Sequence, residues 1–196
     1  MAVQPIGFAY NNLGNALLDE DNVDEAIEAF DSAAQLGPDY VSAYNNLGSA
    51  YFRKGENDEE ARQAFEKVIG LKPDNIDAYM SLASVLRRDG QIRDATEACD
   101  KSIANSRSAI SKNPLNIEAY YQLGCGYYFN GDTVHAVQSF VSLLKINPNS
   151  GPAYFNLGVI YGNQRNDEFS LEAFRRAARL GNRDARLVLA DRGFEW

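Results

Sequence analysis

Few residues in this sequence have the types and spacing that catalysis or metal binding requires. The single histidine, His135, follows one carboxylate, Asp132, and no second histidine exists to complete a metal site. The two cysteines, Cys99 and Cys125, lie 26 residues apart without a CxxC pairing, so no disulfide is implied. The segment Gly124-Cys125-Gly126 lacks the Gly-Lys-Ser/Thr of a phosphate-binding loop. We therefore expect no enzyme activity, no metal and no cofactor.

The charge and hydropathy of the chain limit its partners. The formal net charge is −8, and residues 1–52 hold eight acidic side chains but no Lys or Arg. Nucleic acid is not an expected ligand, because duplex binding normally needs a basic stripe. The chain has no run of 18 apolar residues, and residues 1–5 lack a charged leader before an apolar core. We expect no membrane insertion and a cytoplasmic location.

A pair of adjacent residues recurs five times and organises the whole chain. The copies are Leu13-Gly14, Leu47-Gly48, Leu82-Ala83, Leu123-Gly124 and Leu157-Gly158, at intervals of 34, 35, 41 and 34 residues. In the second copy Tyr44, Leu47 and Tyr51 share one face of a helix. Ala61 and Phe65 mark a second helix that runs back along the first. Each copy is therefore predicted to be a helical hairpin.

The spacing Tyr-x2-Leu-Gly-x2-Tyr, then Ala-x3-Phe, then Pro resembles the tetratricopeptide repeat family, with tyrosine where many members carry tryptophan. The resemblance implies an all-α, right-handed superhelical solenoid whose concave face is lined by the first helix of each pair. It covers residues 7–182, with repeats at about 7–40, 41–75, 76–116, 117–150 and 151–182. Residues 183–196 are expected to form a capping helix and a tail, with Phe194 and Trp196 beneath it. Because the chain begins almost directly in a repeat, it is also interpreted as a segment of a longer protein.

The third repeat is longer than the others. Cys99, which stands where the other repeats have phenylalanine, lies 15 residues before Pro114, whereas the spacing elsewhere is 8. We interpret the seven extra residues as two more turns of the second helix, about 10 Å. The alternative is a loop, because this segment is rich in weak helix formers. Those residues are Asn105, Ser106, Ser108 and Ser111.

A small polar side chain stands directly before the Leu-Gly pair in every repeat. The series is Asn12, Asn46, Ser81, Gln122 and Asn156. It resembles the asparagine ladder of the superhelical domain of O-linked N-acetylglucosamine transferases, which implies binding of an extended peptide by its backbone. An amide can donate to a C=O and accept from an N–H at once. The alternative is an ordinary solvated helix face, although Asn and Ser are mediocre helix formers.

The neighbouring positions complete the predicted peptide-binding surface. Two residues before the pair the series is Asn11, Asn45, Met80, Tyr121 and Phe155, which changes from amide to apolar along the chain. A small basic cluster follows at Arg53, Arg87 and Arg88, where acidic ligands are expected to bind. A second mode of the family, the carboxylate clamp, would need cations at three of the matching positions. Those positions hold Asn11, Asn15, Asn46, Asp77 and Ser81, so we reject the clamp.

These features predict a non-catalytic protein-interaction scaffold that binds an extended or helical peptide in its concave groove. One alternative is a substrate-recruiting domain of a larger enzyme such as a glycosyltransferase. Another is a self-assembling structural array. Residues 171–196 hold six arginines against four acids, whereas the first repeat is purely acidic. Opposite charges at the two ends predict a weak head-to-tail self-association.

Overall fold

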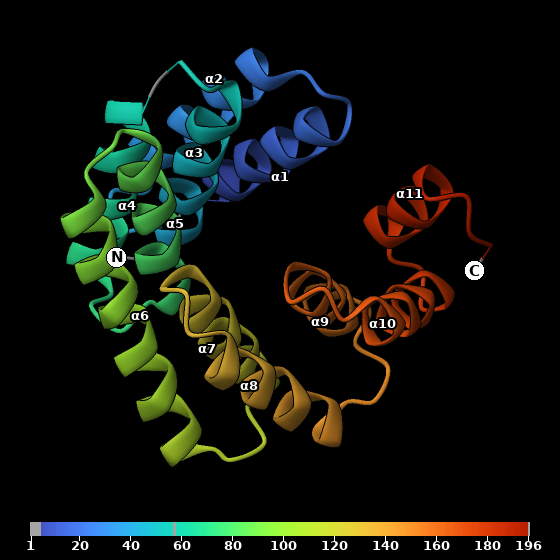
Figure 1. Ribbon diagram of the computed structural model, residues 1–196. Helices are drawn as coiled ribbons and strands as arrows, with labels where there is room; N and C mark the ends of the chain where they lie inside the picture. Colours follow the sequence, from blue (N-terminus) through green and yellow to red (C-terminus); the bar gives the residue numbers. More distant parts are fainter. Residues whose placement is uncertain (1–4, 57, 196) are drawn as a thin grey trace. The chain divides into compact units, whose positions relative to one another are not determined.

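A computed structural model describes residues 5–56 and 58–195, and all regular secondary structure in that part of the chain is α-helical (Figure 1). The prediction of an all-α fold is confirmed. The helices group into two compact units, with unit 1 ending at Ser102 and unit 2 beginning at Ile103. The expectation for Trp196 lies outside the described residues.

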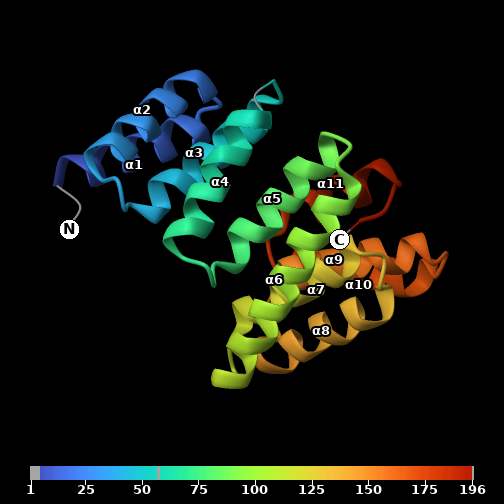
Figure 2. The same ribbon diagram turned by 90° about the vertical axis from the view of Figure 1, so that its left-hand side faces the viewer.

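Unit 1 consists of helical hairpins in chain order. Its helices are α1 (Pro5–Asp19), α2 (Val23–Leu36), α3 (Val41–Lys54), α4 (Asp58–Leu71), α5 (Ile76–Arg88) and the first half of α6 (Ile92–Lys112). Helix α1 packs against α2 and α3 against α4, side by side in both views (Figure 1, Figure 2). Gly55 closes α3 with a φ of 80°, a left-handed conformation that glycine adopts without the steric penalty of a Cβ.

Unit 2 repeats the same hairpin arrangement and ends with a single helix. Its helices after α6 are α7 (Ile117–Phe129), α8 (Thr133–Ile146), α9 (Gly151–Asn163), α10 (Asp167–Arg179) and α11 (Arg183–Asp191). Helix α11 packs on α10 and buries Ala185 and Leu189 against Phe174 and its neighbours. Phe194, expected beneath this helix, is 42% exposed.

The seven extra residues of the third repeat continue its second helix. Helix α6 has 21 residues, whereas α2, α4 and α8 each have 14. The longer helix is therefore confirmed and the loop is excluded. Two serines of this helix, Ser102 and Ser106, are fully buried, and the Ser102 hydroxyl donates to the carbonyl oxygen of Ile76 at 3.2 Å. A hydrogen-bonded hydroxyl lets a weak helix former sit inside the core.

Side chains at the helix starts explain several of the boundaries. The residues before α5, α7, α9 and α11 accept a hydrogen bond from the backbone N–H three residues on, as N-caps do. They are Asn75, Asn116, Ser150 and Asn182. Each cap lies after a turn that ends the preceding helix, so a local hydrogen bond marks where the next first helix begins.

The recurring glycine is required by close packing within each hairpin. A Cβ built on this glycine would lie 2.5 to 2.9 Å from a phenylalanine ring of the second helix. The four pairs are Gly14 with Phe30, Gly48 with Phe65, Gly124 with Phe140, and Gly158 with Phe174. In the third repeat both partners differ, since Ala83 and Cys99 are the buried residues at these positions. A smaller second-helix side chain there makes room for the added methyl group.

Candidate functional site

All of the predicted site residues lie on the first helices of the hairpins. Helices α1, α3 and α5 of unit 1 carry ten of them, and α7 and α9 of unit 2 carry four. Those of unit 1 are Asn11, Asn12, Asn15, Asn45, Asn46, Arg53, Met80, Ser81, Arg87 and Arg88. Those of unit 2 are Tyr121, Gln122, Phe155 and Asn156. Each unit therefore presents its own group of candidate residues.

In unit 1 the structure brings three asparagines together, and we call them the amide cluster. The Nδ2 of Asn46 donates to the Oδ1 of Asn11 at 3.0 Å and to the Oδ1 of Asn15 at 3.2 Å. Asn11 is only 6% exposed, so it is available to orient Asn46 but not to contact a ligand in solvent. Both donor hydrogens of Asn46 are directed at these oxygens. Its own Oδ1 has no hydrogen-bond partner in residues 5–56 and 58–195.

Unit 2 holds an equivalent pair. The Nδ2 of Asn156 donates to the hydroxyl of Tyr121 at 3.2 Å. The two residues are 35 positions apart, as are Asn46 and Asn11, so the same inter-repeat contact occurs in both units. Burial, then the neighbouring Cys125, raises the pKa of Tyr121. Gln122 differs, because its amide donates to Glu118 one turn earlier on the same helix, at 3.0 Å.

The apolar members of the predicted surface are partly core residues. Tyr121 lies edge-on to Phe140 with ring centroids 5.9 Å apart, and Phe155 lies 5.6 Å from Phe174. Met80 places its sulfur 4.0 Å from that of Cys99. Each of the three therefore contacts the second helix of its own hairpin and is half-buried, so only part of each side chain can face the predicted peptide-binding surface.

The predicted arginines Arg53 and Arg88 are bound by other residues of unit 1. Arg53 donates to the carbonyl oxygen of Leu18 at 3.0 Å and pairs with Asp21 at 2.7 Å. Arg88 donates to the carbonyl oxygen of Phe52 at 2.7 Å and also binds Asp58.

The Arg88 guanidinium carbon lies 3.8 Å from the centroid of the Phe52 ring, a cation–π contact. Each arginine thus reaches back to the end of the preceding first helix. We call these contacts the arginine braces. A signal for them exists in the sequence, because Arg53 and Arg88 lie 35 residues apart at one repeat position.

A pocket of about 230 Å³ opens beside Tyr121 in unit 2. We call it the Tyr121 pocket; it is lined by Ile117, Glu118, Tyr121, Leu143, Ser150 and Pro152. Of these residues, only Tyr121 was predicted from the sequence. Helical periodicity could have found Glu118, which lies one turn before Tyr121 on the same face of α7. Leu143 lies on the second helix and could not have been found in this way.

The residues considered for chemistry have structural surroundings. Cys99 is fully buried, and this burial, with Asp100 nearby, raises the pKa of its thiol to about 11. Asp132 caps α8 by accepting from the backbone N–H of His135 at 3.1 Å, and its Oδ2 lies 2.6 Å from the ring Nδ1. These bonds, the backbone one first, lower the pKa of Asp132. In residues 5–56 and 58–195, no three His, Cys, Asp or Glu side chains are grouped as metal ligands.

Comparison with known families decides the classification. Models of the tetratricopeptide repeat match residues 11–76, 59–110, 117–150 and 151–180. The chain belongs to the tetratricopeptide repeat family. Tetratricopeptide repeat proteins are typically non-catalytic scaffolds that bind proteins or peptides. Over the part of the chain that the structure describes, no tetratricopeptide helix is long and apolar enough to cross a membrane.

Curated relatives match short segments of the repeat array. The chain is 45% identical over 53 residues to the chloroplastic tetratricopeptide repeat domain-containing protein PYG7 of Arabidopsis thaliana. It is 32% identical over 77 residues to the type IV pilus assembly protein PilF of Pseudomonas aeruginosa. These matches cover 27% and 39% of this chain, but only 18% and 31% of the two relatives. The chain thus matches less than a third of the length of either relative.

Solved structures share the tetratricopeptide fold. TTC0263 of Thermus thermophilus matches with a TM-score of 0.76 at 17% identity, covering 94% of this chain and 97% of its own. MamA of Desulfovibrio magneticus RS-1 matches with a TM-score of 0.56 at 19% identity, covering 91% and 97%. YrrB, titled a TPR protein with an unusual peptide-binding site, matches at 0.50 and 24%, covering 97% and 100%. At these identities the likeness is one of fold alone.

Proposed function

We propose that the chain is a non-catalytic protein-interaction module that holds an extended peptide against the first helices of its repeats. The observation that carries the proposal is the fixed orientation of two amides. The Nδ2 groups of Asn46 and Asn156 both donate to a side chain 35 residues earlier. Neither amide oxygen has a hydrogen-bond partner within the described residues. An oriented carbonyl of this kind can accept from the backbone N–H of a peptide, whatever its sequence.

The Tyr121 pocket would supply preference where the amides supply none. Ile117, Leu143 and Pro152 give it an apolar wall, and Glu118 places a carboxylate at its edge. A peptide with an apolar side chain in this pocket could reach Asn156 with its backbone, because Asn156 is bonded to the hydroxyl of Tyr121. A few side chains buried in pockets of an interface often provide most of the binding free energy.

The other predicted residues keep different roles in the proposal. Asn12, Asn45, Met80, Ser81, Arg87, Gln122 and Phe155 would complete the contact surfaces of the two units. We assign Arg53 and Arg88 to bracing the repeats, because their charges are already paired with Asp21 and Asp58. Preference for acidic peptides is therefore expected to be weaker than the arginine content of α3 and α5 suggests.

The test begins with peptides selected from a random-sequence library on the wild-type protein. A variant with Asn12, Asn46 and Asn156 all changed to Ala is then compared by calorimetry, after circular dichroism has shown normal helicity. We expect affinity to fall for every selected peptide, by similar factors. If the triple variant folds and binds all of them as tightly as wild type, the amides do not hold the ligand.

A different class of function remains as the alternative, namely a substrate-recruiting part of a larger enzyme such as a glycosyltransferase. The chain matches less than a third of either curated relative, so the roles of those proteins do not decide between scaffold and recruiting domain. The complete reading frame of the gene decides between the two. A catalytic domain in that frame, whose turnover of protein substrates falls when these repeats are deleted, would support recruitment. A frame without one would support a scaffold.

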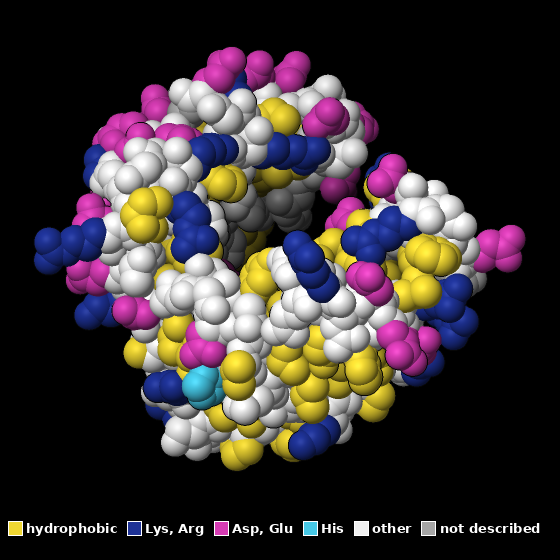
Figure 3. Space-filling model, in the orientation of Figure 1, with side chains coloured by type: hydrophobic (Ala, Val, Ile, Leu, Met, Phe, Trp, Pro, Cys, Tyr) yellow, Lys and Arg dark blue, Asp and Glu magenta, His cyan; other side chains and the backbone are white. Residues whose placement is uncertain are grey.

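We also propose weak head-to-tail self-association, and one observation favours it. Leu13 on α1 is 49% exposed, whereas the equivalent Leu47 is 7% exposed. Acidic side chains surround this end, and Figure 3 shows them along the edge where α2 lies. The arginines of α10 and α11 would complement them.

Sedimentation velocity at low and high salt tests this association, because the Debye length falls from about 10 Å at 0.1 M to about 3 Å at 1 M. We expect weakly associated dimers and longer head-to-tail chains that dissociate as salt rises, because a contact between opposite ends does not close by symmetry. A monomer at every salt concentration would refute the association.

A further inference from the structure

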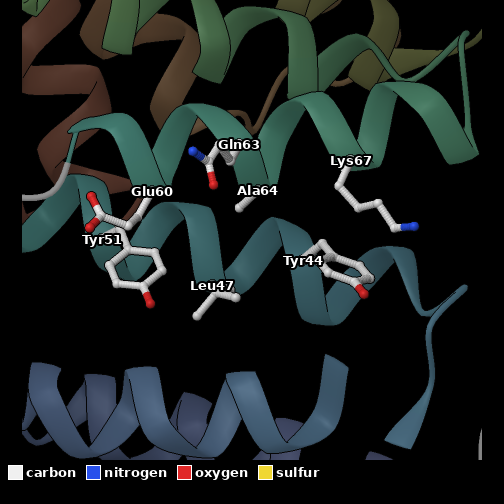
Figure 4. Close-up of a pocket in the computed structure, with 7 residues that line it drawn as sticks. All are labelled: Tyr44, Leu47, Tyr51, Glu60, Gln63, Ala64 and Lys67. Carbon is white, nitrogen blue, oxygen red and sulfur yellow. The ribbon is translucent and has the colours of Figure 1, made fainter. Parts of the chain in front are cut away.

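Unit 1 also contains a pocket, and none of its lining residues is assigned to peptide binding. It lies between α3 and α4 and has a volume of about 230 Å³ (Figure 4). Its lining residues are Tyr44, Leu47, Tyr51, Glu60, Gln63, Ala64 and Lys67. We call it the two-tyrosine pocket.

The pocket is elongated, with an aromatic ring at each end and an apolar floor. Tyr44 and Tyr51 are seven residues apart on α3, which corresponds to about 10 Å along the helix axis. Leu47 lies between them, and Figure 4 shows the two rings at opposite ends with Leu47 in the middle. Leu47 and Ala64 are buried, whereas both tyrosines are half-buried, so the rings remain accessible.

The two ends differ in charge. Glu60 lies at the Tyr51 end of the pocket, and Lys67 lies at the Tyr44 end (Figure 4). The Lys67 Nζ is 5.7 Å from the centroid of the Tyr44 ring, so the chain already places a cation on one of the two rings. Glu60 forms no ion pair with any described residue.

Acidic groups from other elements act on both ends of the pocket. At the Tyr44 end burial, then Asp31 and Asp39, raises the pKa of that tyrosine, but there Lys67 already supplies a cation. Burial, then Asp31 and Glu60, raises the pKa of Tyr51, while Lys54 opposes this effect. Lys54 is itself paired with Asp24 at 2.7 Å. The Tyr51 ring therefore has a negative surrounding and an accessible face, the combination that attracts a cation.

We propose that the two-tyrosine pocket binds a lysine or arginine side chain of a partner protein. The cationic head would lie against the Tyr51 ring and Glu60, and the alkyl stem would run over Leu47 and Ala64. A long aliphatic side chain with a charged tip fits an apolar channel that ends in an acidic aromatic site. This contact is separate from the peptide groove and goes beyond it, because none of its residues belongs to the amide cluster or the Tyr121 pocket.

The test uses Nα-acetyl-lysine amide, which keeps its side-chain ammonium group, as the probe. Nα-acetyl-norleucine amide is the neutral control. Both are titrated into the full chain and followed by chemical shifts of backbone amides and tyrosine rings. We expect the lysine probe to shift Tyr51, Leu47 and Glu60, with weak affinity that falls as salt is added. The norleucine probe should bind more weakly at the same place.

Two matched variants separate the charge from the fold. Glu60→Gln should weaken the lysine probe roughly two- to fivefold, the factor expected for an exposed cation contact, and leave norleucine unchanged. Glu66→Gln removes the same charge from α4 outside the pocket and should change neither titration. Tyr51→Leu should reduce lysine binding as well, and Glu60→Gln decides the question if that variant is unstable. Equal binding of the two probes, an unchanged lysine affinity in Glu60→Gln, or no shifts at these residues would overturn the proposal.

Discussion

The two units join successive hairpins through different side chains at the same repeat position. In unit 1 Arg53 and Arg88 reach back to the carbonyl oxygens of Leu18 and Phe52, 35 and 36 residues earlier. In unit 2 the equivalent residue is Asn163, whose Nδ2 donates to the hydroxyl of Tyr128 at 2.8 Å, again 35 residues earlier. Three of the repeats therefore carry a donor at this position that bridges to the preceding hairpin, whereas the equivalent residue of the fourth repeat is Phe129. The donor is a charged arginine in unit 1 and a neutral asparagine in unit 2. The contribution of this contact to stability should therefore depend on salt in unit 1 but not in unit 2.

The third repeat offers a second contrast, within unit 1. Its Ala83 and Cys99 replace the glycine and phenylalanine that face one another in the other hairpins. All five hairpins bury two facing residues at these positions, although the residue types of the third repeat differ from those of the others. A core of this kind tolerates exchange only when both partners change.

The largest effect is expected from removing a core ring. Phe65→Ala in unit 1 and Phe140→Ala in unit 2 should each reduce the free energy of unfolding by about 3–5 kcal/mol. Both rings are almost fully buried, at 2% and 1% exposure. Urea unfolding followed by circular dichroism measures the loss. Val134→Ala, at a side chain that is 62% exposed, should have little effect, and an equal loss there would contradict this account of the core.

A double-mutant cycle sharpens the contrast between the third repeat and the others. Cys99→Phe should overpack the hairpin against Ala83 and cost about 1–3 kcal/mol. Adding Ala83→Gly should recover part of that loss, because it recreates the pair found at Gly48 and Phe65. The unfolding free energies of the two single variants and the double variant give the coupling. Strict additivity would show that the two positions do not compensate one another.

Alkaline pH should also distinguish the third repeat. Burial raises the pKa of the Cys99 thiol from the ordinary 9.0 to about 11. Below pH 9.0 the thiol is protonated in both states, so its full contribution to stability is present. Between pH 9.0 and about 11 the thiol ionises in the unfolded chain first, and stability is lost as the pH rises.

Denaturant midpoints over this pH range measure that loss. Cys99→Ala should decline less steeply than wild type, because it lacks the buried thiol. The remaining ionisable groups are common to both proteins. Identical pH profiles for Cys99→Ala and wild type would contradict a raised thiol pKa.

The smallest stability effect concerns the arginine braces. Arg88→Met should reduce the stability of unit 1 by roughly 1 kcal/mol, since the pair with Asp58 is partly exposed and screened. The loss should shrink at 1 M salt. Asn163→Ala in unit 2 removes a neutral hydrogen bond of similar size, and its effect should not depend on salt. The same salt response in both variants would remove the proposed difference between the units.

Most of the fold could be predicted from the sequence, because the same residue pattern for a helical hairpin recurs in each repeat. The Leu-Gly pair placed the first helix of each hairpin and the Ala-x3-Phe spacing placed the second, and of the two interpretations of the seven extra residues the structure shows the helix. The site was less predictable. Asn11 and Asn12 are adjacent and chemically identical, yet Asn11 is buried beneath Asn46 while Asn12 is exposed. The partners of Arg53 and Arg88 lie 30 to 36 positions earlier, and only packing of successive hairpins brings them within reach.

The most direct test of the central claim is calorimetry of several unrelated library-selected peptides on single variants of unit 2. Asn156→Ala should cost about 0.5–1.5 kcal/mol of binding free energy for every peptide, because it removes a contact to the common backbone. Tyr121→Phe should cost less, since it keeps the ring and frees only the amide that its hydroxyl orients. Asn163→Ala, which removes another amide bonded to a tyrosine hydroxyl, should leave binding unchanged. Binding that is the same in Asn156→Ala and wild type for all peptides would contradict the proposal that oriented amides hold the ligand.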